Sequence, residues 1–521
     1  MPAADGSPSL VRPVGRSTLY FWIGALGCLY LKSFVLPHTP IVQGDSSPIF
    51  LLEAARMLRG EVIYRDFFEF VLPGTPYTYL AFFKLFGMQA WIPSVMFVLL
   101  GAGLAWSGVA IAKHLVAGKY IFLPSLLFLG FAFISESDPT HHWYSSLAVM
   151  LALVVLIDNR SPARLAAAGL LCGLAALFTQ NRGVSALIGI ACYLLWEWKS
   201  KEQDGRALLR AQAFLLVPFL VPILAAVAYF VSRAGLEPVF NAIVIFPVKY
   251  FHLWYWNTSA VYLTEVPDMP FILELPALGV WFSIHLLLPL VYLLFLVRWW
   301  QRAKARPEEP WDRLMLLTIV GLFLFVGVAF SASWLRLCSV SLPAMIVFVW
   351  FVKSSGKPSK ALTYLLWAVG AAIFVGQSVI AQVDWRAYLN TPAGRVAFQE
   401  PDVYEKFQWL RDRTRPGDYI WQASDCSLYY LLHLQNPAPV SFVTATGYTR
   451  PEQVRDVVAA LERSRPQFVL WTVWLDVPRF GSRELFDFQV LAPIRAYLRA
   501  HYHLVRSFGA PDYEQVWERN P

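Results

Sequence analysis

The feature of this sequence that most constrains its fold is a succession of long apolar runs, which recur from the N-terminal region to about residue 380. A helix needs about 20 apolar residues to cross the hydrocarbon core of a bilayer. Backbone groups cannot stay unpaired in lipid, and the runs lack the alternation of barrel strands, so they predict membrane-spanning helices. We predict eleven spans, with 163–197 readable as one broken element: 18–36, 88–112, 120–134, 144–157, 163–179, 183–197, 211–232, 277–297, 314–331, 337–352 and 361–381.

The composition supports this interpretation. Of the 521 residues, 57% are hydrophobic and only 15% are charged, and the mean hydropathy is +0.49. A soluble protein carries about 25% charged residues, so lipid must solvate most of this chain. The sequence therefore predicts a polytopic α-helical membrane protein.

The charges of the connections predict the orientation. If residues 1–17 are cytoplasmic, every second connection is basic, whereas the alternate ones are poor in Lys and Arg, as in SESDPTHHW (135–143). This is the positive-inside pattern. An odd number of spans then places the C-terminal part outside. The basic connections contain Lys113, Lys119, Arg160, Arg164, Lys199, Lys201, Arg206, Arg210, Arg298, Arg302, Lys304, Arg306, Arg313, Lys353, Lys357 and Lys360.

The net charge of +8 follows from these loops, and no basic run interleaved with aromatic residues occurs, so we predict no nucleic-acid partner. Four of the five cysteines lie in predicted spans and Cys426 is alone outside them. No disulfide framework follows from this pattern.

The sequence divides into a membrane domain (18–384) and an external α/β domain (385–521). External loop one (37–87) contains a short amphipathic helix (48–59) that we expect in the interface plane. In the external domain we predict strands at 419–424, 439–443, 468–474, 503–508 and 513–519, and helices at 402–415, 451–463 and 484–500, the second of them capped by a threonine.

Loop one begins with QGDSSPIFLLEAARMLRGEVIYRDFFEF (43–70), in which Asp45 stands at the mouth of a span, just before the amphipathic helix. Pro48 suits the first helical turn. Asp45 can be a charge that complements the helix dipole, or an acid held at a fixed depth for chemistry. Position alone does not separate these two roles.

Several motifs in loop one resemble the first external loop of the GT-C superfamily of lipid-linked sugar transferases. The residues are the Gly44-Asp45 pair, then Gly60, Tyr64, Asp66, Phe67, Pro73 and Phe86-Gly87. The pattern is most similar to the bacterial branch with protein O-mannosyltransferases and aminoarabinose transferases. WLRLCSVSLP (334–343) is similar to that family's late arginine motif. The family's loop commonly has an acidic pair, whereas here Asp45 is followed by Ser46.

The resemblance implies an inverting hexosyl- or pentosyltransferase of the bacterial inner membrane. It implies a polyprenyl-phosphate sugar as donor and a glycan, lipid or protein hydroxyl as acceptor, on the extracytoplasmic face. A carboxylate that takes the acceptor proton contributes about 10²–10⁴-fold, and cations must stabilise the leaving phosphate. Asp45 is the predicted base or metal-associated acid.

Other residues could contribute to this site. Glu136 and Asp138 are further candidate catalytic acids, in a loop that can also be simply solvated. The candidate phosphate ligands are Arg336, Lys249 and Arg182, of which Lys249 can be an interface anchor and Arg182 a structural cap. A divalent ion (Mg, Mn or Zn) is an optional cofactor, with Asp45, His141, His142 and His252 as candidate ligands. We expect at most one of His141 and His142 to face the site, and Arg65 and Asp66 to pair.

Three other classes of protein compete with the transferase. A transporter or flippase of lipid-linked glycans predicts internal repeats and mid-membrane charges, which the sequence lacks. A glycan polymerase or ligase would use a large late loop, such as 233–276 with Lys249 and His252. A scaffolding role leaves the acid-bearing first loop unexplained.

Overall fold

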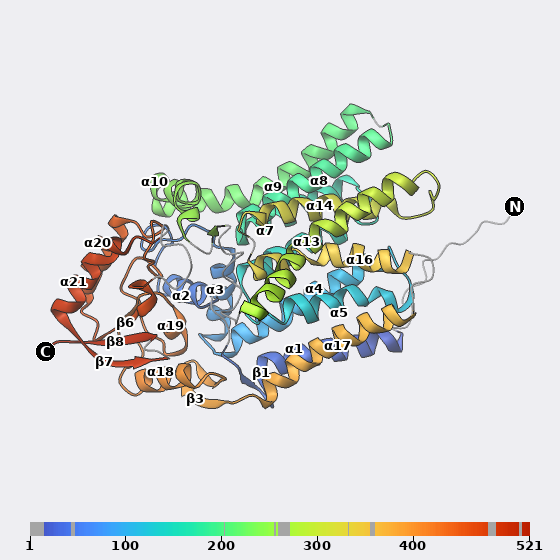
Figure 1. The fold of residues 1–521 in the computed structure, drawn as a ribbon. Coiled ribbons are helices and arrows are strands. Elements are labelled where there is room, and N and C mark those ends of the chain that lie inside the picture. Colours follow the sequence, from blue (N-terminus) through green and yellow to red (C-terminus); the bar gives the residue numbers. More distant parts are fainter. Residues whose placement is uncertain are drawn as a thin grey trace.

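The computed structural model describes residues 15–42, 47–202, 204–254, 257–258, 271–331, 333–354, 360–477, 486–509 and 513–521. A large helical part carries a smaller C-terminal part with a β-sheet at one end (Figure 1). Loop one lies where the two parts meet, with α2 (Ser47–Leu58) and α3 (Gly74–Phe86) close to the C-terminal part.

Each predicted span overlaps a helix, and residues 163–197 form two helices that separate at Thr179. Four helices are long and apolar enough to cross a membrane, and four shorter apolar helices accompany them among the described residues. The count of eleven therefore stays a prediction. The helices are α1 (Arg16–Ser33), α4 (Trp91–Ala112), α5 (Leu123–Phe128, continued by a π-helix at Leu129–Phe133), α6 (His141–Leu156), α7 (Pro162–Phe178), α8 (Gln180–Ser200), α9 (Gly205–Ala234), α13 (Phe271–Arg302), α14 (Trp311–Ala329), α16 (Leu342–Ser354) and α17 (Lys360–Val383).

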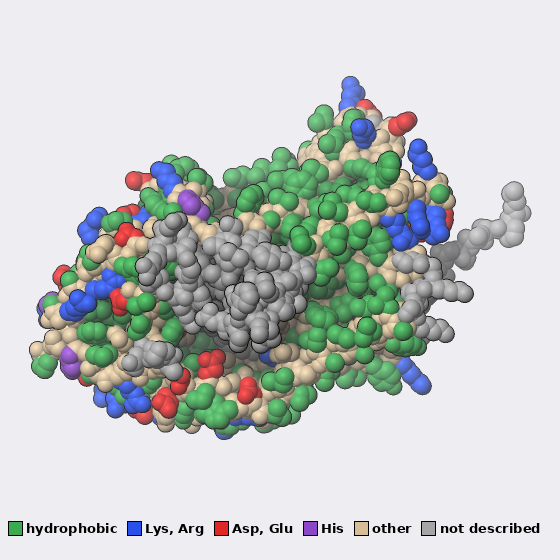
Figure 2. Space-filling view, in the orientation of Figure 1, with side chains coloured by type: hydrophobic (Ala, Val, Ile, Leu, Met, Phe, Trp, Pro, Cys, Tyr) green, Lys and Arg blue, Asp and Glu red, His purple; other side chains and the backbone are tan. Residues whose placement is uncertain are grey.

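The surface of the helical part is largely hydrophobic. Only 17% of the most apolar stretch of α9 and 22% of that of α17 are buried within the protein. Figure 2 shows hydrophobic side chains covering this part, while Lys and Arg side chains gather at the end away from the C-terminal part. So large an apolar surface needs a lipid environment.

A close approach of two helices depends on Gly169 and Gly173, which lie one turn apart on α7. A Cβ atom at Gly169 would collide with the carbonyl oxygen of Leu215, and one at Gly173 with that of Phe219, both on α9. Glycines at this spacing allow helix backbones to pack closely in a membrane.

We expect Gly173→Val to lower the midpoint of thermal unfolding in detergent by several degrees, since overpacking costs about 1–3 kcal/mol. Gly376→Ala on α17 is the matched control, because nothing lies within 4 Å of the added methyl group. Equal midpoints for the two variants would contradict the close approach of α7 and α9.

Helix α2 is buried between the two parts, and its expected polar face is not in water. Glu53 and Arg56 are 0% and 4% exposed, and the short helix α19 (Ser427–Leu431) of the C-terminal part packs against α2. The position of this helix in the interface plane stays a prediction, but the polar face of α2 is covered by protein. A segment far away in the sequence covers that face, which helical periodicity cannot reveal.

The C-terminal part contains a four-stranded sheet in the order β5-β6-β8-β7 (Ile420–Gln422, Phe468–Thr472, Glu514–Arg519 and Tyr502–Phe508). The β5–β6 pair is parallel and the other pairs are antiparallel. Helices α18 (Pro401–Arg411), α20 (Pro451–Ser464) and α21 (Ala492–His501) accompany it, and β3 (Ala387–Thr391) forms a separate hairpin with β4 (Gly394–Phe398).

Two local predictions for this part are wrong. Residues 439–443 form no strand; they belong to an irregular segment packed against loop one, where the backbone N–H of Phe68 donates to Pro439 O at 2.7 Å. The N-cap of α20 is Arg450, whose backbone N–H donates to Gln453 Oε1 at 3.0 Å. The predicted cap, Thr449, instead accepts a hydrogen bond from the backbone N–H of Thr444 at 2.7 Å.

Candidate functional site: a cavity between the helical and C-terminal parts

A cavity of about 1060 Å³ lies where loop one, the helix ends and the C-terminal part converge. This is at the upper limit of the roughly 300–1,000 Å³ usual for ligand pockets, so it has room for two substrates. Its lining comes from six separate stretches of chain: residues 49–71, 136–142, 179–182, 243–257, 327–336 and 424–474.

Asp45, the main candidate from the sequence, lies outside the described residues. It precedes Ile49, which lines the cavity, by four positions. The structure adds an acid that the sequence analysis missed, Glu69 in DFFEF. Its Oε1 accepts hydrogen bonds from the backbone N–H groups of Phe70 and Val71 at 2.7 and 2.9 Å. The signal that could have identified Glu69 is that the family's first loop commonly has a second acid, and Glu69 is such an acid in loop one.

Glu53, on α2, is a fully buried acid beside Glu69. No described residue donates a hydrogen bond to either of its oxygens. A hydrogen bond between the carboxyl groups of Glu53 and Glu69 would need a proton on one of them. Burial first, and then the neighbouring charge of Glu69, raises the pKa of Glu53 well above its usual value, against the opposing effect of Arg56. This shift favours the protonated form of Glu53 in the folded protein.

The raised pKa of Glu53 makes the free energy of unfolding depend on pH. Because the folded pKa of Glu53 is raised, its contribution is fully present below the unfolded value of 4.5 and is lost as pH rises through the folded value. We expect Glu53→Gln, which stays neutral, to lose less stability than the parent as pH rises from 5 to 9. The difference grows by at most about 1.4 kcal/mol per pH unit.

Unfolding midpoints in detergent across this pH range measure the effect. Glu405→Gln is the control, because Glu405 has a side chain 57% exposed. Parallel curves for the parent and Glu53→Gln would show that Glu53 is already ionised in the fold.

The second external loop contributes three lining residues. Glu136 is half-buried in the cavity wall, and His141 and His142 both line the cavity with ring centroids 4.0 Å apart. The expectation that at most one histidine faces the site is therefore wrong, since the two rings lie against each other, tilted by 35°, at the first turn of α6. Asp138 is buried (7% exposed) and is not part of the lining.

Arg336 is the predicted phosphate ligand that the structure places in the cavity wall. It lies on the short helix α15 (Trp334–Cys338), capped by Ser333. Its guanidinium donates to Ser331 O at 2.8 Å and to Asn257 Oδ1 at 2.6 Å, and lies 5.9 Å from the ring centroid of Phe251. These contacts hold a cation at the cavity surface.

The other two phosphate candidates are placed differently. Arg182 lines the cavity but is only 3% exposed, and its guanidinium donates to His142 O, Ser145 Oγ, Ser146 Oγ and Ser339 Oγ at 2.7–3.1 Å. Its contacts tie α6 and α8 to the segment after α15. Lys249 and the metal candidate His252 are not among the lining residues.

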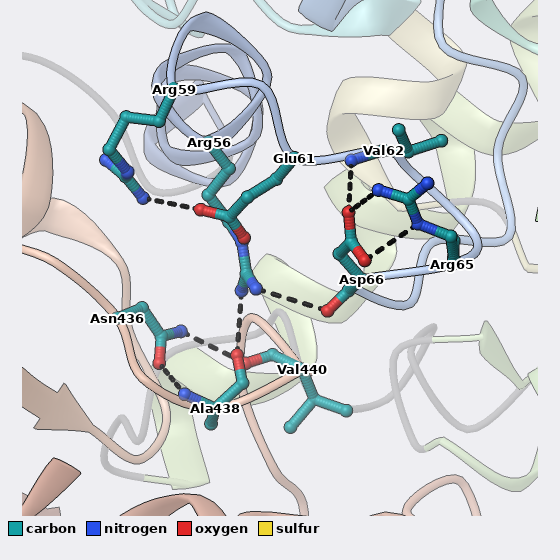
Figure 3. Close-up of polar contacts among 9 residues, drawn as sticks. All are labelled: Arg56, Arg59, Glu61, Val62, Arg65, Asp66, Asn436, Ala438 and Val440. Atoms are coloured by element: carbon teal, nitrogen blue, oxygen red, sulfur yellow. Dashed lines mark hydrogen bonds and ion pairs between the residues drawn. The ribbon is translucent and has the colours of Figure 1, made fainter. Parts of the chain in front are cut away.

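Loop one is held rigidly against the C-terminal part (Figure 3). Arg56 donates to Glu61 at 2.6 Å and, across the interface, to Ala438 O at 2.7 Å. Arg65 and Asp66 pair at 2.8 Å, as predicted, and Asp66 also accepts from the backbone N–H of Val62 at 2.7 Å. The hydrogen bond from Arg65 is the main cause that lowers the pKa of Asp66. The rigid loop fixes the position of Glu69.

The described residues contain no group of three or more His, Cys, Asp or Glu side chains that could hold a metal ion. His141 and His142 lie together, but no described acid completes a ligand set with them. Asp45, the acid among the candidate metal ligands, lies outside the described residues, so a divalent ion stays an optional cofactor and we derive no step through a metal.

The fold is similar to that of solved membrane glycosyltransferases. No family model and no curated protein sequence matches the chain. The structure of ArnT from Cupriavidus metallidurans bound to undecaprenyl phosphate is 12% identical, with a TM-score of 0.61 over 97% of this chain and 98% of that one. The oligosaccharyltransferase AglB from Archaeoglobus fulgidus, in complex with an inhibitory peptide and a dolichol-phosphate, is 12% identical, with a TM-score of 0.53 over 97% and 74%.

A second structure of the Archaeoglobus fulgidus oligosaccharyltransferase, in complex with Zn and sulfate, has a TM-score of 0.50 at 13% identity over 96% of this chain and 73% of that one. These proteins share the GT-C architecture, so the resemblance inferred from loop one is confirmed for the fold. The chain has a mostly helical GT-C membrane fold.

Proposed function

We propose that the protein transfers a sugar from a polyprenyl-phosphate donor to an acceptor hydroxyl on the extracytoplasmic face of the bacterial inner membrane. The observation that carries this proposal is the cavity beside loop one, which is lined by both the acid Glu69 and the cation Arg336. The similarity to structures that bind undecaprenyl phosphate and dolichol-phosphate supports a lipid-linked donor.

The reaction needs one displacement. The acceptor oxygen attacks the anomeric carbon, a new C–O bond forms, and the bond from that carbon to the phosphate oxygen breaks, with inversion. The acceptor proton passes to a carboxylate of loop one, for which we propose Asp45, with Glu69 as the second acid of the loop. Arg336 stabilises the charge that develops on the departing polyprenyl phosphate.

We propose that the basic connections are cytoplasmic and the C-terminal domain is outside. The positive-inside pattern supports this orientation. It is also consistent with Lys and Arg gathering at the end of the helical part away from the C-terminal part (Figure 2).

The test uses purified full-length protein in detergent with polyprenyl-phosphate mannose, glucose, galactose, arabinose and aminoarabinose, each with glycan, peptide and lipid acceptors. We expect release of polyprenyl phosphate with at least one pair, matched by sugar on the acceptor. Movement of an intact donor across a vesicle membrane, without release of polyprenyl phosphate with any donor–acceptor pair, would establish a flippase instead.

A further inference from the structure

The charged and uncharged residues of the cavity come from different parts of the chain. Among the described residues, the charged and histidine side chains of the lining come from the helical part and its loops: Glu69, Glu136, His141, His142, Arg182 and Arg336. The lining residues from the C-terminal part carry no charge among those described: Ser424, Val440, Ser441, Phe442, Tyr448, Thr449, Gln453 and Trp474. The cavity therefore has one ionic side and one neutral side.

Aromatic rings dominate the neutral side. The ring of Trp254 lies 5.3 Å from that of Phe442 and 5.1 Å from that of Tyr448, and the rings of Phe442 and Tyr448 are nearly parallel at 5.9 Å. We call Trp254, Phe442, Tyr448, Ser441 and Gln453 the neutral wall. Aromatic faces carry negative potential, which attracts the polarised C–H groups on the apolar face of a sugar ring.

The polar groups of the neutral wall are hydroxyls and an amide. The Ser441 hydroxyl is buried and has no hydrogen-bond partner among the described residues. A change of χ1 rotamer re-aims such a hydroxyl at low cost. Gln453 accepts from the backbone N–H of Arg450 through Oε1. Hydroxyls and amides both donate and accept, as the hydroxyls of a sugar require.

The loop that carries Tyr448 is preorganised. Thr449 Oγ1 accepts from the backbone N–H of Thr444 and bonds to its hydroxyl at 3.1 Å, while the Thr444 hydroxyl also bonds to that of Thr446 at 3.0 Å. Tyr448 also lies next to the acid side, because its ring is 6.3 Å from that of Phe70, the residue after Glu69. A ligand on the neutral wall therefore lies beside loop one.

We infer that the neutral wall is the acceptor subsite and that it binds an uncharged sugar ring, so that the acceptor is a saccharide hydroxyl. This inference rests on the proposed function and adds the acceptor class to it. A phosphorylated or acidic acceptor would need a cation on this wall. The nearest one in the loop, Arg450, stacks on Phe68 at 5.1 Å and pairs with Glu452 at 3.3 Å, outside the lining.

Two measurements test the inference. The first is saturation-transfer NMR of the detergent-solubilised protein with neutral mannan, glucan, galactan and arabinan oligosaccharides, which needs no turnover. The second is transfer from the donor panel to these oligosaccharides, to the same glycans on a lipid, to phosphorylated sugars, and to Ser- and Thr-containing peptides. We expect binding of, and transfer to, a neutral glycan. Comparing the free oligosaccharide with the same glycan on a lipid shows which of the two forms is the acceptor.

The variants are Phe442→Ala and Ser441→Ala, with Tyr419→Ala as the control aromatic, 44% exposed and outside the cavity. We expect both wall variants to raise the acceptor KM about tenfold or more, with the donor KM unchanged, as loss of one acceptor contact predicts. Ser441→Ala removes an unpartnered hydroxyl, so a merely structural role predicts no change in either KM.

The remaining outcomes separate the two proposals. Transfer to peptides or phosphorylated sugars only, unaffected by the wall variants, would overturn the acceptor class while the transferase stands. Oligosaccharide binding that Phe442→Ala abolishes, with no transfer from any donor, would support the subsite and overturn the transferase. No binding and no transfer to neutral glycans would overturn the inference.

Discussion

Asp45→Asn is expected to lower the kcat for release of polyprenyl phosphate by about 10²–10⁴-fold, because the amide cannot take the acceptor proton. Glu69→Gln is expected to cost about tenfold, less than a general base contributes. The reason is that Oε1 of Glu69 is already held by the N–H groups of Phe70 and Val71. Initial rates at saturating donor and acceptor measure both effects.

The control for this pair is Asp402→Asn, which changes an exposed acid at the first turn of α18. Unfolding midpoints and elution volumes of all variants should match those of the parent. If Glu69→Gln shows the larger loss and Asp45→Asn keeps most of the activity, the base is Glu69. A large loss in Glu136→Gln alone would move the proton acceptor to the second loop.

Arg336→Ala is expected to lower kcat by about 10²–10³-fold, the usual loss when one group that stabilises developing negative charge is removed. Arg336→Lys should restore only part of it, because an ammonium group cannot reproduce the planar, two-point phosphate contact. Single-turnover rates with a labelled donor separate this effect from donor binding.

The matched control for Arg336 is Lys249→Ala, which removes an exposed cation that does not line the cavity. We expect its rate to stay within about threefold of the parent, as for a residue that makes no transition-state contact. Similar losses in both variants would indicate a general effect of surface charge and would remove Arg336 from the phosphate site.

Some of the site was predictable because its signals are local. The GD motif and the Tyr64–Phe67 segment carried the resemblance that the shared GT-C fold confirms. The Arg65–Asp66 pair followed from adjacency in the sequence and is present at 2.8 Å. The late arginine, Arg336, was recognised from its motif and lies in the cavity wall.

Other residues could not be assigned from the sequence, because their roles depend on distant partners. Arg182 was a candidate for either a phosphate ligand or a structural cap, and only the fold shows that its guanidinium binds the His142 carbonyl and the Ser339 hydroxyl. Glu53 and Arg56 belong to the amphipathic helix expected from the sequence, but only the fold shows that α19, far away in the sequence, packs against this helix and that both side chains are buried. Glu69 carried no spacing signal of its own.

The sequence by itself determined that this chain is a polytopic helical membrane protein with an acid-bearing first loop. Hydropathy, charge alternation and short motifs are properties of neighbouring residues, so they can be read along one dimension. Only the tertiary structure decided which side chains share the cavity and that the rings of Trp254, Phe442 and Tyr448 meet in its wall. That convergence brings together six separate stretches of chain, and no periodicity within any one of them encodes their meeting.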